Sequence, residues 1–341
     1  MKKVFSYFLI FITSVFSSVA TAQIITVNGA IAPKEMGLTL IHEHIMVDWI
    51  GADSTGYHRW DKRKVVARAF PYLNALKEHG VTSFLDCTPA YLGRDPYVLK
   101  KLSDSTGIHI LTNTRYYGSG NNQYIPKSIR NNSPQEIAAD WIKEFQYGID
   151  SSGIKPGFIK MAVANEDKLS AMHTNLIKAA ALTHLATGMA IVSHTGGVKP
   201  AIAQIEVLKD MGVSPEAFVW THAQNGNMPG YIKAAGLGAW ISLDNLHDRP
   251  DNEPDSNGSI SWFIKTLSEL KNHGILNHIL ISQDAGWYNV GQKNGGNYRG
   301  YTILFTKLIP QLKKHGFSQE DIDMLLKENP KNAYSLRIRS E

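Results

Sequence analysis

Short apolar stretches rich in Val, Ile, Leu and Phe recur along the chain and alternate with stretches in which apolar residues follow a helical spacing. Several helix-like stretches end at a glycine, as at Gly80 and Gly188, and the next apolar stretch follows directly. This order is typical of α/β proteins with parallel strands. We predict eight strands, at residues 38–43, 81–86, 109–113, 157–162, 189–193, 217–221, 238–243 and 278–283.

The stretches between these strands predict helices and long loops. Helices are expected at residues 63–79, 134–147, 175–187, 199–211 and 262–272, and a last one at 318–327, which Asn329–Pro330 should stop. Three connections are long enough to shape a binding site, at residues 114–133, 245–261 and 285–300. They carry Tyr and Trp residues, and aromatic side chains on loops tend to line pockets.

Polar residues close several of the predicted strands, and their placement favours a closed barrel. A (β/α)8 TIM barrel brings the carboxyl ends of all its strands around one mouth, whereas an open doubly wound sheet gathers its site near one crossover. We therefore predict an α/β TIM barrel with a site at the carboxyl ends of the strands. Residues 23–341 are expected to form this barrel as a single domain.

The first residues have the pattern of a secretory signal. Met1-Lys2-Lys3 is followed by an apolar stretch to about Val19 and then by Ala20-Thr21-Ala22, which predicts a signal peptide at residues 1–22 with cleavage after Ala22. The alternative is an uncleaved membrane anchor. The rest of the chain has no apolar run long enough to span a bilayer, so the mature protein is expected in the periplasm or outside the cell, free of the membrane.

Charge and cysteine content exclude other classes of function. The chain has 35 Lys and Arg against 30 Asp and Glu, a net charge of +5, and no basic run of the kind that nucleic acid binding needs. Its one cysteine, Cys87, cannot form an intramolecular disulfide. We expect a buried structural thiol there, with a catalytic nucleophile as the alternative.

Six residues at strand ends carry the chemistry. His42 and His44 lie two apart on one predicted strand, so both imidazoles point to the same face and can reach one ion, while Glu43 points to the other face. The others follow later strands. Scattered core histidines would not explain a Lys and an Asp in matching positions. The predicted metal-binding residues are His42, His44, Lys160, His194, His222 and Asp284.

A pair of divalent ions explains why a lysine belongs to this set. A lysine amine cannot bridge two cations, but its carbamate, formed with carbon dioxide, has two oxygens and a negative charge. Lys160 is therefore predicted to be an N6-carboxylysine bridge, with an ordinary salt bridge as the alternative. Two ions sharing a water lower its pKa and supply a hydroxide near neutral pH. Asp284 can hold one ion and accept the proton as the hydroxide attacks.

The set His-x-His, Lys, His, His, Asp over eight βα units resembles the phosphotriesterase-like family of the amidohydrolase superfamily. Gly157-Phe158-Ile159-Lys160 and Ile281-Ser282-Gln283-Asp284, with Asn329–Pro330, resemble its segments. The resemblance implies a TIM barrel, often a homodimer, with zinc or another divalent metal. It implies that His42, His44 and Asp284 hold one ion, that His194 and His222 hold the second, and that Lys160 bridges them.

The same resemblance suggests roles for residues on the loops. Tyr116 falls where the lactonase branch has a tyrosine that polarises a carbonyl; pocket lining without catalysis is the alternative. Asn225 stands where triesterases often have an Asp of their proton relay, and Asn cannot carry a proton. Arg249 suits an anionic substrate group or is a solvated loop residue. The predicted substrate pocket comprises Tyr117, Asn225, Asn245, Arg249 and Trp287.

These observations predict an exported hydrolase in which a hydroxide bridging two metal ions attacks a carbonyl ester of a small-molecule substrate, a lactone above all. Tyr116 and Asp284 are the expected catalytic residues. Three alternatives remain open on the sequence. They are a phosphotriesterase, an amidase or esterase of an acyl conjugate, and a periplasmic binding protein that has lost activity.

Overall fold

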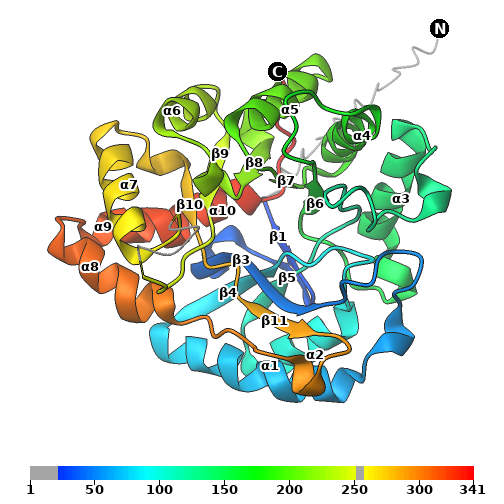
Figure 1. The fold of residues 1–341 in the computed structure, drawn as a ribbon, viewed down its shortest axis with the longest axis horizontal. Coiled ribbons are helices and arrows are strands. Elements are labelled where there is room, and N and C mark those ends of the chain that lie inside the picture. The colour runs from blue at the N-terminus through cyan, green and yellow to red at the C-terminus, as the bar shows by residue number, and fades with distance from the viewer. Residues whose placement is uncertain (1–21, 251–256) are drawn as a thin grey trace, which may run out of the picture.

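The computed structural model describes residues 22–250 and 257–341. It is an α/β barrel in which helices surround the strands on all sides (Figure 1). The predicted strands are confirmed with small shifts at their ends, and all neighbouring pairs are parallel. In chain order they are β3 (Leu38–Val47), β4 (Val81–Asp86), β5 (His109–Leu111), β6 (Ile159–Ala162), β7 (Ile191–His194), β8 (Phe218–Thr221), β9 (Trp240–Leu243) and β10 (Ile279–Ile281).

Backbone hydrogen bonds at two seams close the eight strands into one ring. Between β5 and β6, the Gly157 amide donates to the Thr112 carbonyl at 2.7 Å. Between β10 and β3, the Asp284 amide donates to the His42 carbonyl at 3.1 Å. The fold class is therefore the predicted TIM barrel. The second seam joins two residues of the predicted metal set directly through the backbone.

The strand β3 departs from simple alternation, and this departure positions the His-x-His pair. Leu40 pairs with Phe84 and Glu43 with Asp86, so three steps on β3 face two on β4, which is a β-bulge. Ile41 packs in the barrel interior with Leu85 and Leu280, and the bulge lets the histidines that follow it also face inward. Strict alternation from Ile41 would turn both away.

The helices pack their apolar faces onto the outside of the barrel, and each predicted helix is present. Many begin at a side-chain cap, as where Ser133 accepts from the Glu136 amide. Three helices were not predicted from the sequence: α2 (Pro96–Thr106), α6 (Met228–Gly236) and α8 (Ile309–Lys314). The predicted ones before the last helix are α1 (Lys62–Leu76), α3 (Pro134–Tyr147), α4 (Ala171–Thr187), α5 (Val198–Asp210) and α7 (Ile260–Asn272).

The prediction that Asn329–Pro330 stops the last helix is wrong. Helix α9 (Gln319–Asp323) runs through a π-helical turn (Met324–Glu328) directly into α10 (Asn329–Tyr334). A π turn accommodates a proline, which lacks an amide hydrogen and crowds the preceding turn. The Asn329 side chain donates to the carbonyls of Leu276 and Ile279, both at 2.7 Å, and so ties this helix to the start of β10.

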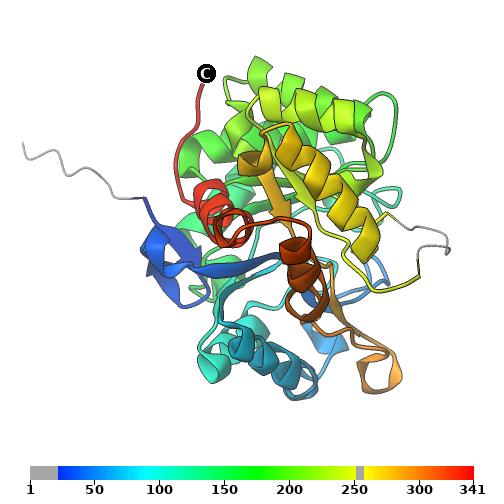
Figure 2. The same cartoon turned by 90° about the vertical axis from the view of Figure 1, so that its left-hand side faces the viewer.

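A short antiparallel hairpin of β1 (Ile24–Thr26) and β2 (Gly29–Ile31) lies at the amino ends of the barrel strands. Figure 2 shows it on the side away from the segment that carries β11 (Gly286–Asn289). The predicted signal peptide lies almost entirely outside the described residues. Among the residues described, no helix is long and apolar enough to cross a membrane.

Candidate metal centre

All six predicted metal-binding residues meet in one cavity of about 190 Å³ at the carboxyl ends of the strands. They arrive from β3, β6, β7, the end of β8 and the segment after β10, so residues far apart in the chain become neighbours. Two groups have ligand atoms within 4.8 Å of one another: His42 with His44 and Asp284, and His42 with His222 and Asp244. The first is the predicted set for one ion, whereas Asp244 was not predicted to take part.

Hydrogen bonds fix which nitrogen of His44 faces the cavity. Its Nδ1 lies 2.7 Å from the Thr88 hydroxyl, which donates its own hydrogen to the Met46 carbonyl at 3.0 Å. Nδ1 is therefore the protonated nitrogen, and Nε2 presents a lone pair. That Nε2 lies 3.0 Å from Oδ1 of Asp284. Two atoms that both present electron pairs repel each other at this distance, and a cation bound by both would remove that repulsion.

Asp244 holds two more histidines in the same orientation. Its carboxylate lies 3.0 Å from Nδ1 of His42 and 2.8 Å from Nδ1 of His222. His222 gives its Nδ1 hydrogen to Asp244, and Nδ1 of His42 is turned toward the same carboxylate, so the Nε2 atoms of both rings stay available to bind an ion. Burial would raise the pKa of Asp244, but the charges of His222 and His42 hold it well below its usual range. Burial also lowers the pKa of His42 to about 4, so this ring is neutral at pH 7.

Lys160 is the clearest sign that the site takes a further group. Its side chain is 2% exposed, and Nζ has no hydrogen-bond partner among the described residues. A buried ammonium without a partner is strongly unfavourable. Conversion to a carbamate in contact with metal ions would remove that charge and supply two acceptor oxygens. The donors present therefore fit a pair of divalent ions.

The backbone around the site is held in rarely populated conformations. His222 and Asp284 have φ angles of +59° and +51°, in the left-handed region. Strain of this kind persists only where the surroundings enforce it, and it gathers at functional sites. Glu43 provides part of that enforcement, because its buried carboxylate accepts from the Ala285 amide at 2.7 Å and the Ser282 hydroxyl at 2.8 Å. Burial raises the pKa of Glu43 to about 7.

The predicted position of Tyr116 in the metal cavity is wrong. Its ring is 1% exposed and packs in the outer core against Tyr91 and Trp141. The next residue, Tyr117, lines the cavity instead, and its hydroxyl lies 3.0 Å from Nδ1 of His194. Successive residues of an extended segment point to opposite sides. A prediction that is wrong by one position therefore assigns a core residue to the cavity, as happened with Tyr116. The segment is extended, since Tyr117 pairs with Ala162.

Aromatic rings form one wall of the cavity. The Trp287 ring stacks on His44 at 3.8 Å between centroids, and Trp49 stacks on Trp287 at 5.6 Å. Tyr117 stands on the other side, beside His194. Trp287 thus lies in the predicted substrate pocket. Cys87 is fully buried at the cavity floor, where burial raises the pKa of its thiol, as expected for a structural cysteine.

The remaining predicted pocket residues line a second, adjoining cavity of about 370 Å³. We call it the amide chamber. It shares His194, His222 and Asp284 with the metal cavity, so the two meet at the candidate metal centre. Its other lining residues are Gln224, Asn225, Asn245, Arg249 and Asn257.

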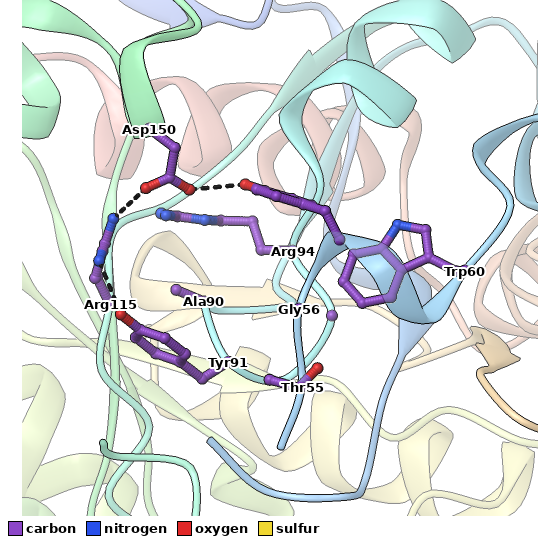
Figure 3. Close-up of a pocket in the computed structure, with 10 residues that line it drawn as sticks. Thr55, Gly56, Trp60, Ala90, Tyr91, Arg94, Arg115 and Asp150 are labelled. Atoms are coloured by element: carbon purple, nitrogen blue, oxygen red, sulfur yellow. Dashed lines mark hydrogen bonds and ion pairs between the residues drawn. The ribbon is translucent and has the colours of Figure 1, made fainter. Parts of the chain in front are cut away.

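A third cavity, of about 210 Å³, lies beside the metal cavity. Figure 3 shows Arg115 between Asp150 and Tyr91, with Arg94 next to it. Segment 87–94 separates the two cavities, because Pro89 and Leu92 line the metal cavity while Ala90, Tyr91 and Arg94 line the third one. Its charged groups bind one another, so it offers no unpaired set of metal donors. We call it the arginine cavity.

Comparison with known proteins identifies the family of this chain. The sequence pattern of the Phosphotriesterase family matches residues 22–334. The phosphotriesterase homology protein of Escherichia coli strain K12 is 30% identical over 295 residues, which cover 86% of this chain and 96% of that protein.

More distant relatives carry the names of different activities. An aryldialkylphosphatase of Saccharolobus solfataricus is 28% identical over 325 residues, covering 90% of this chain and 98% of the relative. An N-acetyltaurine hydrolase of Rattus norvegicus is 24% identical over 349 residues, covering 91% of this chain and 97% of the relative. The same scaffold therefore serves substrates with different bonds.

Proposed function

Because this chain belongs to the phosphotriesterase family, and is thus a metal-dependent hydrolase, we propose that it cleaves carbonyl esters, with lactones as the preferred class. The observation that carries the proposal is the Tyr117 hydroxyl, 3.0 Å from His194 inside the metal cavity. A phenol there can donate a hydrogen bond to a carbonyl oxygen as negative charge develops on it. Tyr117 takes the role that the sequence analysis gave to Tyr116.

The chain's own residues would hold the ions and handle the proton. His42, His44 and Asp284 would hold one ion, and His194 and His222 the other. Lys160 as an N6-carboxylysine would bridge them, and zinc suits this mixture of donors. Once bound, the ions would lower the pKa of a shared water and polarise the carbonyl. Burial would raise the pKa of Asp284, but the surrounding histidines hold it well below its usual range, so Asp284 is ionised at neutral pH.

Phosphotriester hydrolysis fits this site less well. Asn225 is an exposed lining residue of the amide chamber, and a carboxamide there cannot carry the proton onward as a carboxylate would. Asp244, the nearest alternative, is committed to His42 and His222. We therefore expect triester turnover only as a weak side activity.

Amide hydrolysis is the second candidate, and the amide chamber favours it. Gln224, Asn225, Asn245 and Asn257 could bind the polar part of an acyl conjugate next to the metal centre. The N-acetyltaurine hydrolases among the relatives act on an amide of that kind, as their name states. The same attack on a carbonyl serves both reactions.

We also propose that residues 1–22 direct export to the periplasm or the medium, and that the mature protein forms a homodimer. The export proposal rests on the composition of the first residues, and the dimer on the family. We propose that the protein acts on a small-molecule substrate and does not bind nucleic acid.

The test compares substrates on one preparation. The mature chain would be reconstituted with zinc and bicarbonate, and proton release measured with acyl-homoserine lactones, aryl esters, N-acyl amino acids and a phosphotriester. A lactone rate well above the rest supports the proposal. A triester rate equal to or above the lactone rate overturns it. If the N-acyl amino acids are hydrolysed fastest of the four classes, the second candidate, amide hydrolysis, is established. No turnover with both ions bound would indicate a binding protein.

The bridging lysine has a separate readout. Carbon-13 bicarbonate should give a carbamate signal in the reconstituted protein that disappears in Lys160→Ala and persists in Lys155→Ala, which changes an exposed lysine. A signal unchanged in Lys160→Ala would contradict the carboxylated bridge.

A further inference from the structure

The candidate metal centre lies between two chambers with different chemistry. The metal cavity is walled by carbon-rich side chains, among them Trp49, Leu92 and Trp287. The amide chamber has no hydrocarbon side chain in its described lining. Among the described lining residues Asp284 carries the only carboxylate, and four residues end in carboxamides. A substrate whose carbonyl sits at the shared residues therefore extends one part into each chamber.

The carboxamides are supplied by the segments that also position the metal centre. Asn225 lies one short turn after His222, and Asn245 directly follows Asp244 at the end of β9. Gln224 is 3% exposed, and its Oε1 accepts from the Asp244 amide at 3.3 Å, which leaves its NH2 group able to donate.

The far side of the amide chamber is also tied to this framework. Asn257 donates to the Gln224 carbonyl at 3.3 Å. The His247 amide donates to the Gly258 carbonyl at 2.9 Å, which brings the two ends of segment 247–258 together. Gln224 and Asn257 are therefore held in place relative to the proposed site of attack.

On the basis of the proposed carbonyl hydrolysis, we propose that the amide chamber binds a part of the substrate that carries several hydroxyl groups, as in a polyhydroxylated lactone. A carboxamide both donates and accepts hydrogen bonds, and a hydroxyl group does the same, so each can satisfy the other in either direction. Arg249 adds donors at the rim. A hydrocarbon part placed here would strip water from these groups and return no hydrogen bonds.

The preference should appear as a ratio of rates. Sites built to hydrogen-bond a hydroxyl reject analogues that lack it far more strongly than apolar pockets reject an extra methylene. The comparison uses glucono-δ-lactone and δ-valerolactone, which share the ring ester and differ in their hydroxylated substituents. We expect kcat/KM to be about 100-fold higher for the hydroxylated lactone, with background hydrolysis subtracted, in keeping with the selectivity of hydrogen-bonding sites.

Two variants locate the effect. Asn225→Leu and Asn245→Leu keep the size of the side chain and remove its hydrogen bonds. Each should lower kcat/KM for glucono-δ-lactone about tenfold and leave δ-valerolactone nearly unchanged, the loss expected for one good hydrogen bond at a polar site. Asn272→Leu, at the exposed end of α7, is the matched control and should change neither rate.

A binding measurement separates this proposal from the proposed function. Calorimetry on the metal-free protein would compare the lactam analogues of the two lactones, which cannot be hydrolysed as lactones. Tighter binding of the hydroxylated lactam, lost in Asn245→Leu, supports the chamber assignment even if no ester is cleaved. Equal binding of both lactams, together with equal turnover of both lactones, overturns the chamber assignment. In that case lactone turnover still supports the proposed carbonyl hydrolysis, which does not depend on the chamber. Circular dichroism confirms that each variant is folded.

Discussion

The metal cavity and the arginine cavity lie on opposite sides of segment 87–94, and both are lined by charged groups. In the arginine cavity these groups pair as opposite charges, although Nε of Arg94 itself has no hydrogen-bond partner among the described residues. Arg94 makes two hydrogen bonds to Glu144, at 2.7 and 3.1 Å, and Arg115 binds Glu144 and Asp150, each at 2.7 Å. In the metal cavity, by contrast, Nζ of Lys160 has no partner among the described residues.

This difference indicates that the arginine cavity is a structural charge network and that the metal cavity is a ligand-binding site. The arginine cavity and Glu144 behind it tie together the segments after β4, β5 and α3, and their charges cancel without any added group. Figure 3 shows the Arg115–Asp150 pair. The metal cavity gathers electron-pair donors that face each other across 3.0 Å, which cations would satisfy. Substitutions in the first should therefore change stability, and substitutions in the second should change activity.

The largest effect is expected for Asp284→Asn. This change keeps the shape of the side chain but removes the charge that would hold an ion and the base that would accept the proton. We expect kcat for the best lactone to fall about 1,000-fold, within the range for a general base. Thermal unfolding should stay close to that of the parent. Normal turnover with both ions bound would contradict the role, and Asp167→Asn, at an exposed position, is the control.

Glu144→Gln, in the arginine cavity, is expected to lower stability and to leave activity nearly unchanged. The change leaves two guanidinium groups, one of them 1% exposed, without their shared carboxylate. Removing one partner of a buried ion pair costs about 3–5 kcal/mol of unfolding free energy. Urea unfolding should show this loss, while kcat per folded molecule stays within a few-fold. Glu328→Gln, in an exposed pair, should cost less than about 1 kcal/mol. A severe loss of kcat without loss of stability would contradict this prediction and would show that the arginine cavity takes part in catalysis.

Asp86 extends the comparison to a buried carboxylate that no described cation pairs with. Burial raises its pKa to about 7, against an ordinary value of 3.8. Between these two pH values the unfolded chain releases the proton and the folded chain keeps it, so stability falls as the pH rises from about 4 to about 7. A shift of about 3 pKa units corresponds to about 4 kcal/mol at most.

The Asp86→Asn variant isolates this contribution. Asn can still accept from the Ile45 amide, which donates to Asp86 at 2.9 Å, but it does not titrate. The unfolding free energy of the metal-free protein, measured in urea at pH 4.5, 6.0 and 7.5, should therefore rise for the variant relative to the parent as the pH increases. Parallel pH profiles would show that Asp86 is ionised in the folded protein throughout.

The barrel, and the meeting of the six candidate metal-binding residues in one cavity, could be predicted from the sequence because both depend on local patterns. Strand-like stretches before His194 and His222 place those side chains at the carboxyl end whatever the packing around them. The sequence likewise places Asp244 after a strand, where it could orient Asp284 or the pocket, but its contact with His42 joins residues from opposite parts of the chain. Only the closed barrel brings them together.

Other features depend on long-range packing and leave no local signal. The bulge in β3 follows from its different registers with β4 and β11. The strand β11 exists because Gly286, with φ of +102°, approaches the His44 carbonyl more closely than any side chain would allow. The π turn that carries the last helix past Pro330 and the Arg94–Glu144 pair are likewise decided by neighbours distant in sequence.

Tyr116 and Tyr117 bring the comparison down to adjacent residues, one facing the core and one the metal cavity. Tyr117→Phe removes the hydroxyl near His194, and we expect kcat for a lactone to fall about 10- to 100-fold, at or below the range for one donor to a developing oxyanion. Tyr116→Phe removes a hydroxyl whose nearest partner, Asp140, is 3.4 Å away, so activity should stay within about twofold and stability within about 1 kcal/mol. KM should change little in either variant if the phenol acts on the transition state alone. The reverse result, with Tyr116→Phe as the slower enzyme, would return the catalytic role to the residue that the sequence first suggested and would mean that the segment 115–117 turns over when substrate binds.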